Sequence, residues 1–222
     1  MSLIEMIQQE TKDFLEDPDL TQEELEKGNQ NMSICNMFQG EFFITITCDD
    51  CGEQINFRNE FQCLDIALIK QKNISSNQLL EIYFTPSLMI GENAWICSKC
   101  DEQNASFHSF KISKIPEILV IYFKRLEYDP IKKVNFKNSL AIIPNEFLDL
   151  SSFLQDPLEN PTYSLFGIIF HQKKEDFAHF FSFCKREMDR TWWEFNDGYQ
   201  PILQNPFKFS EDIQFLFYHR NY

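Results

Sequence analysis

The sequence predicts an α+β protein with an antiparallel, β-rich body and a helical N-terminus. Two observations support this fold class. Most of the chain after Phe38 alternates apolar and polar residues, as strands do. Two Cys-x-x-Cys pairs interrupt these strands, which is typical of a metal-bound β subdomain. The predicted strands are 41–48, 61–69, 117–126, 163–171, 179–185, 191–197 and 213–219.

The remaining elements divide the chain into two parts. Residues 1–36 form an acidic segment of helical character, with a capping box at Thr21 and Glu24 and a predicted helix end at Gly28. Residues 37–222 form the body, which contains one short helix at 75–84. Proline, asparagine and serine predict loops at 128–139 and 150–163.

Composition limits the classes of partner. The formal net charge of −14 argues against nucleic acid, because a polyanion would be repelled. No apolar run is long enough to span a bilayer, and the N-terminus lacks the pattern of a secretory signal. We therefore expect a cytoplasmic or nuclear protein without nucleic-acid or membrane partners. The acidity favours a protein partner with a basic face, or serves solubility alone.

Four cysteines predict a metal site. Cys48 and Cys51 form one Cys-x-x-Cys pair, and Cys97 and Cys100 form the other. Four thiolates suit a tetrahedral, structural Zn²⁺ that ties together two hairpins distant in sequence, and Gly52 suits the tight turn of the first pair. The alternative is redox chemistry, for which one Cys-x-x-Cys at a helix start is expected.

The stretch from His179 to Asp197 predicts acid–base chemistry. His179 opens a strand, and Asn196 and Asp197 end a later one. An imidazole that donates from one nitrogen to an amide or carboxylate keeps its other nitrogen as a base for a thiol. The alternative is that His179 is a hydrogen-bonded core residue.

The order of these motifs resembles the fingers and palm of the ubiquitin-specific proteases. The resemblance runs from about Phe38 to His219. It is carried, in order, by "NMFQG", "CDDC … CSKC", "KISKIPEILVIYFKRL", "YSLFGIIFHQKKEDFAHFFSFCK", "WWEFND" and "IQFLFYHR". It implies a partial papain-like cysteine peptidase fold, with zinc-ribbon fingers at about 41–112 and a palm at about 113–222. It also implies that His179 is the general base, that Asn196 orients it with Asp197 beside it, and that the partners are ubiquitin or ubiquitinated proteins.

The nucleophile that this family uses is not identified in the sequence. The family's box resembles Gly-Asn-Thr-Cys-Tyr-x-Asn, and the nearest echo, "GNQN", has Asn31 where the thiol belongs. Cys35, Cys63 and Cys184 lie among apolar residues and are interpreted as buried structural residues. The family's glycine and tyrosine around the histidine are replaced by Ala178 and Phe180.

Three hypotheses follow for this chain, which we expect to be inactive by itself. It belongs to a deubiquitinase whose cysteine box is encoded upstream. Alternatively, it is a catalytically dead protein that binds ubiquitin or acts as a scaffold. The third hypothesis is a zinc-ribbon adaptor for another partner.

Overall fold

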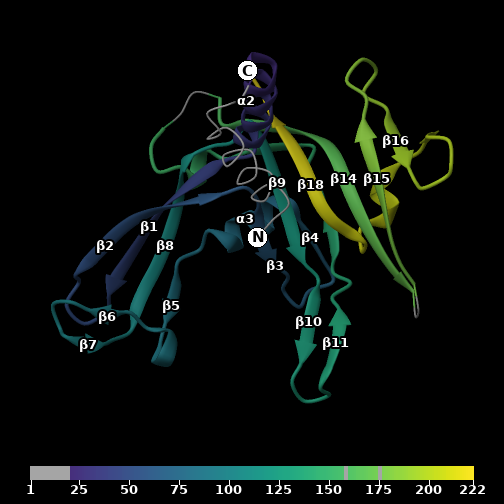
Figure 1. The fold of residues 1–222 in the computed structure, drawn as a ribbon. Helices are drawn as coiled ribbons and strands as arrows, with labels where there is room; N and C mark the ends of the chain where they lie inside the picture. Colours follow the sequence, from purple (N-terminus) through teal and green to yellow (C-terminus); the bar gives the residue numbers. More distant parts are fainter. Residues whose placement is uncertain (1–20, 158–159, 175–176) are drawn as a thin grey trace.

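The computed structural model describes residues 21–157, 160–174 and 177–222. Figure 1 shows a broad sheet from which a narrower sheet projects, with helix α3 near their junction. The prediction of an α+β fold with a β-rich body is confirmed. Residues 1–20 of the predicted N-terminal segment lie outside the described residues.

The broad sheet has eight strands in the order β17-β16-β15-β14-β18-β9-β3, with β13 paired to β14. All its pairs are antiparallel except β3 with β9. Its strands are β3 (Leu64–Ala67), β9 (Ile118–Lys124), β13 (Phe147–Asp149), β14 (Thr162–Lys174), β15 (Phe177–Lys185), β16 (Trp192–Phe195), β17 (Ile202–Leu203) and β18 (Ile213–Arg220). The division into fingers and palm stays a prediction, and β3, from within the predicted finger range, joins this sheet.

The narrower sheet has four strands in the order β2-β1-β8-β5. They are β1 (Gly40–Cys48), β2 (Gln54–Phe61), β5 (Ser87–Met89) and β8 (Ser106–Lys114), and the small hairpin of β6 (Ile96–Cys97) and β7 (Glu102–Gln103) lies at the far tip (Figure 1). Gly40 faces Phe61, whose ring stacks on Phe42 at 4.2 Å between centroids. A Cβ at Gly40 would lie 2.3 Å from that ring, so only glycine fits where β1 begins.

Two further strand pairs complete the β structure. Strands β4 (Asn73–Ser75) and β12 (Ala141–Ile143) pair in parallel. Strands β10 (Leu126–Asp129) and β11 (Val134–Lys137) form a projecting hairpin. The prediction of a loop at 128–139 was therefore wrong. The residues that predicted a loop form the turn of this hairpin, where Asp129 Oδ1 accepts hydrogen bonds from the N–H groups of Ile131 and Lys132.

The described helices are α2 (Gln22–Met37), α3 (Ser76–Tyr83) and the short 3₁₀ turns η1 (Gly91–Asn93), η2 (Ser151–Phe153) and η3 (Pro206–Phe209). Capping boxes begin α2 at Thr21 and α3 at Ser75. The predicted helix end at Gly28 was wrong, because α2 continues to Met37. Glycine costs about 1 kcal/mol of helix propensity relative to alanine but keeps its N–H, so it does not by itself end a helix. Cys35, in the last turn, is buried.

The core packs one face of the eight-stranded sheet against helix α3, and it also includes buried residues of the four-stranded sheet and of β4 and β12. Alternate residues of β9 supply Leu119, Ile121 and Phe123, which are fully buried, and α3 contributes Leu79 and Leu80. Val120, on the other face of β9, is also buried, but the fully buried residues follow the period of two expected of one sheet face.

A buried arginine joins three separate segments beside this core. Arg125 is 1% exposed and follows β9 directly. Its guanidinium donates hydrogen bonds to the carbonyl oxygens of Ile213 at 2.6 Å, Asn138 at 2.8 Å and Leu140 at 3.0 Å. Burial lowers the pKa of Arg125 to about 10, which still leaves it charged at neutral pH.

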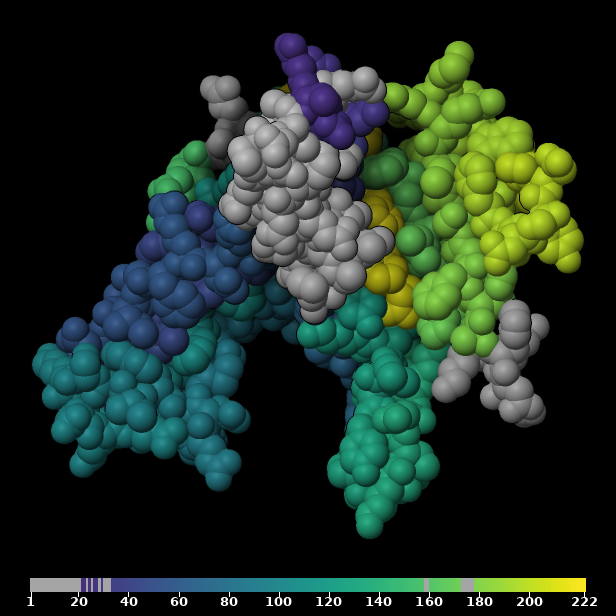
Figure 2. Space-filling model, viewed as in Figure 1, coloured from purple at the N-terminus to yellow at the C-terminus, as the bar shows by residue number. Residues whose placement is uncertain are grey.

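The molecular surface has two projections. Figure 2 shows the tip of the four-stranded sheet and the β10–β11 hairpin extending in the same direction, with a deep notch between them. None of the helices in the described part of the chain has the length and hydropathy needed to cross a membrane.

Candidate functional site

Four cysteine side chains converge at the tip of the four-stranded sheet. Cys48 and Cys51 occupy the turn between β1 and β2, and Cys97 and Cys100 the turn between β6 and β7. All four Sγ atoms lie within 4.8 Å of one another, with Cys48–Cys100 at 4.0 Å and Cys51–Cys97 at 3.5 Å. Thiolates about 2.3 Å from a tetrahedral ion lie about 3.8 Å apart, so the cluster matches a four-thiolate metal site.

The two turns share one backbone form. The N–H of Gly52 donates to the carbonyl of Cys48 at 3.0 Å, and the N–H of Asp101 donates to the carbonyl of Cys97 at 2.8 Å. Both residues have a positive φ, +70° at Gly52 and 57° at Asp101. Each pair is therefore followed by a left-handed residue that folds both thiols toward the same point.

Backbone donors favour the thiolate at one ligand. Burial acts to raise the pKa of the Cys97 thiol, but hydrogen bonds from the backbone of Cys100 and Lys99 hold it lower, at about 7. The donor set is all sulfur, which suits a metal that prefers thiolates.

His179 and Asn196 meet at the edge of the buried face of the eight-stranded sheet. His179 lies near the start of β15, with Phe181 and Phe183 following on the same face. Asn196 follows directly after β16, which pairs with β15 through Phe183 and Glu194. The Nε2 atom of His179 lies 2.7 Å from Oδ1 of Asn196.

The neighbouring hydrogen bond fixes which group donates. Nδ2 of Asn196 donates to Oε1 of Glu194 at 3.1 Å, and an amide nitrogen can only donate. The amide oxygen therefore faces His179 and accepts from it, so Nε2 carries the ring proton. In the neutral ring, Nδ1 of His179 is then the nitrogen with the lone pair that a base requires.

Asp197, the third residue predicted for this site, is placed differently. Asp197 is exposed and lines a cavity of about 460 Å³ with Phe180, Phe195 and Tyr199, while Asn196 makes the contact to His179. Asn196 rather than Asp197 contacts His179 because side chains alternate along a strand, so Asn196 lies on the same face as Glu194 and Asp197 does not.

The prediction that the three remaining cysteines are buried was wrong for Cys184, which is exposed, and Cys63 is only partly buried. Cys35 is 3% exposed in helix α2. Burial raises the pKa of the Cys63 thiol to about 12. Cys184 is exposed on β15 and lies five residues beyond His179, which places it on the opposite face and roughly 16 Å along the strand.

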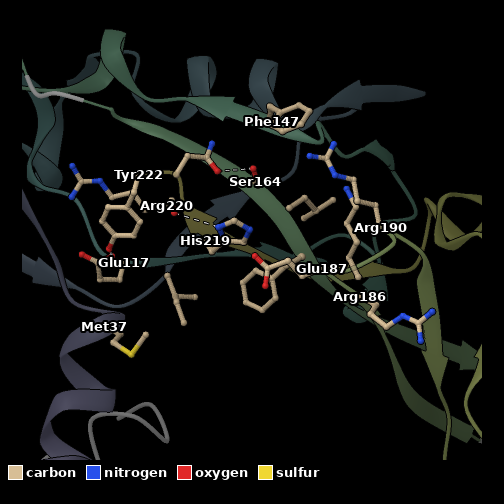
Figure 3. Close-up of a pocket in the computed structure, with 15 residues that line it drawn as sticks. Met37, Glu117, Phe147, Ser164, Arg186, Glu187, Arg190, His219, Arg220 and Tyr222 are labelled. Atoms are coloured by element: carbon tan, nitrogen blue, oxygen red, sulfur yellow. Dashed lines mark hydrogen bonds between the residues drawn. The ribbon is translucent and has the colours of Figure 1, made fainter.

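A larger cavity of about 830 Å³ lies on the opposite face of the sheet, between the end of α2 and the β15–β16 turn (Figure 3). Two of its charged groups have partners close by. Arg186 binds Asp189, and the hydroxyl of Tyr222 donates to Glu117. The predicted catalytic residues do not line this cavity.

Sequence reasoning missed two residues that shape these sites. Glu194 holds the amide of Asn196, and its place two residues earlier on the same strand face was a usable signal. Asp101 plays in the second cysteine turn the part that Gly52 plays in the first. Its one signal was its matching position after the second Cys-x-x-Cys pair.

The fold, with a cysteine cluster at the tip of its four-stranded sheet, is that of the ubiquitin-specific proteases. The chain resembles the solved structure of the yeast SAGA DUBm with a mutant Sgf73, with a TM-score of 0.77 and 20% identity over 99% of this chain and 49% of that one. It also resembles the SAGA Ubp8/Sgf11/Sus1/Sgf73 DUB module bound to ubiquitin aldehyde, with a TM-score of 0.72 and 20% identity over 85% of this chain and 42% of that one.

A family model described as ubiquitin carboxyl-terminal hydrolase matches residues 1–218, and the chain belongs to this family. Ubiquitin carboxyl-terminal hydrolase Usp2 of Drosophila melanogaster is 26% identical over 193 residues, which cover 86% of this chain and 20% of the relative. Ubiquitin carboxyl-terminal hydrolase 2 of Gallus gallus is 22% identical over 191 residues, or 85% of this chain and 53% of the relative. The chain thus spans about half or less of these relatives.

Proposed function

We propose that this chain is the part of a cysteine-type deubiquitinase that binds ubiquitin and supplies the general base, in the cytoplasm or nucleus. His179 is the base and Asn196 orients it. The observation that carries this proposal is the 2.7 Å hydrogen bond between His179 Nε2 and Asn196 Oδ1. Asp197, beside Asn196, serves as an exposed polar neighbour rather than as the orienting group.

The roles of the two residues follow from their protons. A thiol that reaches Nδ1 of His179 loses its proton to that nitrogen and becomes a nucleophile. The imidazolium that forms is stabilised by its Nε2–H bond to Asn196, and it returns the proton to the leaving amine. The thiolate sulfur forms a thioester with the C-terminal glycine of ubiquitin as the isopeptide or peptide bond after that glycine breaks, and a water molecule then hydrolyses the thioester and releases the thiol.

The cysteine cluster is proposed to hold a structural Zn²⁺. Four thiolate ligands leave no open position for water, so the ion would link two turns rather than take part in hydrolysis. Its binding energy would stabilise the tip of the four-stranded sheet, which has few large buried side chains of its own.

Surface features support ubiquitin as the partner. The net charge of −14 complements a basic contact face. The notch between the projections in Figure 2 offers a concave surface. Leu88 on β5 and Phe107 on β8 lie directly opposite each other and are 49% and 44% exposed. Two of the similar solved structures are bound to ubiquitin aldehyde and to monoubiquitin.

We propose that none of the seven cysteines of this sequence is the nucleophile and that another cysteine supplies it. Four of them form the metal cluster. Of the others, Cys35 is buried, Cys63 has a raised pKa, and Cys184 lies on the wrong face of β15. The chain by itself is therefore expected to bind ubiquitin without cleaving it.

Hydrolysis of ubiquitin-aminomethylcoumarin tests the proposal. In the full natural translation product, His179→Ala should slow hydrolysis by roughly 10²- to 10⁴-fold, the usual contribution of a positioned base. The matched change His219→Ala, at an exposed histidine on β18, should leave the rate unchanged. Equal rates for His179→Ala and the wild type would refute the base assignment. Hydrolysis by the isolated chain that is lost on His179→Ala would refute the external nucleophile.

A second candidate is a catalytically inactive protein that binds ubiquitin. The placement of Cys35, Cys63 and Cys184 favours it if no longer translation product exists. Ubiquitin binding with no reaction toward a thiol-reactive ubiquitin probe, in the longest natural product, would establish this candidate instead. A zinc-loaded chain that does not bind ubiquitin would instead favour an adaptor for another partner.

A further inference from the structure

Glu194 is a buried carboxylate on β16, and its side chain contacts the candidate site. The residue is 8% exposed and lies directly opposite Phe183 in the eight-stranded sheet. A buried acid is costly unless its oxygens accept hydrogen bonds. Both oxygens of Glu194 do so, Oε1 from Nδ2 of Asn196 and Oε2 from Nε2 of Gln204.

These bonds belong to a chain of five side chains with a consistent direction. Nζ of Lys208 donates to Oε1 of Gln204, and Gln204 donates in turn to Glu194. From the other end, His179 donates to Asn196, which donates to Glu194. The carboxylate is thus the common acceptor on which two chains of donors converge.

The backbone holds the donor side of this chain in place. The N–H of Gln204 donates to the carbonyl of Trp192 at 3.1 Å, which attaches the segment after β17 to β16. Turn η3 begins just beyond, with Asn205 as its cap, and carries Lys208. The position of Glu194 is therefore set from two elements, and its side chain has little freedom to turn away.

The amide of Asn196 needs such a partner because its two ends are nearly equal in shape. An amide rotated by 180° would present Nδ2 to His179 and Oδ1 to the carboxylate of Glu194. Two acceptors would then face each other, which is unfavourable in a buried setting. An aspartate at position 196 would have no such ambiguity, since both of its oxygens accept.

We propose that Glu194 is a positioning residue, which fixes the amide of Asn196 so that His179 is protonated on Nε2 and basic on Nδ1, and that Gln204 and Lys208 hold Glu194 for this task. This role rests on the proposed function of His179 as a base, but the hydrogen bonds that link His179, Asn196 and Glu194 do not depend on catalysis. Among the described residues, Glu194 is the buried carboxylate that contacts the Asn196 amide, and this role explains why it is buried there.

The tautomer of His179 reports directly whether Glu194 fixes the orientation of the Asn196 amide. Nitrogen-15 spectra of the imidazole rings in the zinc-loaded chain at pH 8 report which nitrogen carries the proton, and His179→Gln identifies the signal. The wild type should show the Nε2–H form. In Glu194→Ala the ratio of the Nε2–H to the Nδ1–H form should fall at least about fivefold, which corresponds to the loss of one hydrogen bond of about 1 kcal/mol.

Two variants separate positioning from folding. Glu194→Gln keeps one oxygen that can accept from Asn196, so it should retain most of the Nε2–H form even if Glu194→Ala folds poorly. Glu146→Ala removes an acid that pairs with Lys185 on β15 outside this chain of bonds, and it should leave the His179 signal unchanged. The same tautomer ratio in the wild type and in Glu194→Ala would overturn the proposal, as would equal losses in Glu194→Ala and Glu146→Ala.

The result can be told apart from a failure of the proposed function. One outcome is that His179→Ala leaves ubiquitin hydrolysis intact while Glu194→Ala still lowers the ratio of the Nε2–H to the Nδ1–H form. That result would support the positioning role of Glu194 and refute the catalytic role of His179. If hydrolysis depends on His179 but the tautomer ratio is the same in the wild type and Glu194→Ala, the catalytic role of His179 is supported and the positioning role of Glu194 is refuted.

Discussion

Replacement of Arg125 by methionine should be among the most destabilising single changes in this chain. Methionine keeps much of the apolar stem but leaves the carbonyls of Ile213, Asn138 and Leu140 without their buried donor. Hydrogen bonds to a charged group contribute about 1.5–3 kcal/mol each, and the three are not additive because water can reach part of the gap. We therefore expect Arg125→Met to lower the free energy of unfolding by about 3–5 kcal/mol.

Urea denaturation followed by circular dichroism, at fixed zinc concentration, measures this loss. For a chain of this length the melting temperature should fall by roughly 10 °C, at 2–4 °C for each kcal/mol. The preceding residue offers a matched control. Lys124 is half exposed and pairs with a half-exposed Asp65 at 3.2 Å, so Lys124→Met should change stability by no more than about 0.5 kcal/mol. Similar losses for the two variants would refute the role given to the buried guanidinium.

Three further predictions concern the metal turn, pH and thiol reactivity. Gly52→Ala should weaken zinc binding in a chelator competition, because a left-handed backbone costs alanine about 1–2 kcal/mol. Hydrogen bonds from the hydroxyl and N–H of Ser151 lower the pKa of Asp149, so their contribution is present above the unfolded pKa and lost as pH falls through the folded pKa. Asp149→Asn should therefore cost more stability in urea titrations at pH 7 than at pH 3. In the zinc-loaded chain, brief alkylation followed by mass spectrometry should label exposed Cys184 well before Cys63, whose pKa burial raises to about 12.

Each of these has an outcome that would contradict it. Asp101→Gly relieves a strained backbone in the second turn, so zinc binding that weakens as much as in Gly52→Ala would exclude the conformational explanation. An Asp149→Asn loss that is equal at both pH values would show that the carboxylate charge is not involved. Labelling of Cys63 ahead of Cys184 would contradict the burial on which the reactivity order depends.

Local patterns predicted the parts of this fold that local physics determines. Strand β9 could be predicted because Ile118–Phe123 is a short continuous apolar run, which is typical of a strand buried in a sheet. The cysteine cluster could be predicted because each two-residue spacer already directs both thiols to one side. The pairing of His179 with a residue at the end of the next strand followed from their order along the chain.

The misses involve pairings and side-chain contacts that the local residue pattern does not mark. The hairpin of β10 and β11 was predicted as a loop because Pro130 and Asn135 read as turn residues, although the flanking residues pair in register. Arg125 binds carbonyl oxygens up to 88 residues away, and no local pattern marks such partners. The contact from Gln204 to Glu194 likewise depends on how β17 returns along β16.

Calorimetric titration of the zinc-loaded chain with ubiquitin examines the central claim most directly. If this chain is the ubiquitin-binding part of a deubiquitinase, heat should be released or absorbed in a saturable curve with one ubiquitin per chain. Paired charge-reversal changes on the two projections should weaken that curve, and added salt should weaken it further. A flat titration, obtained with material that carries one zinc ion per chain and unfolds cooperatively, would contradict the account.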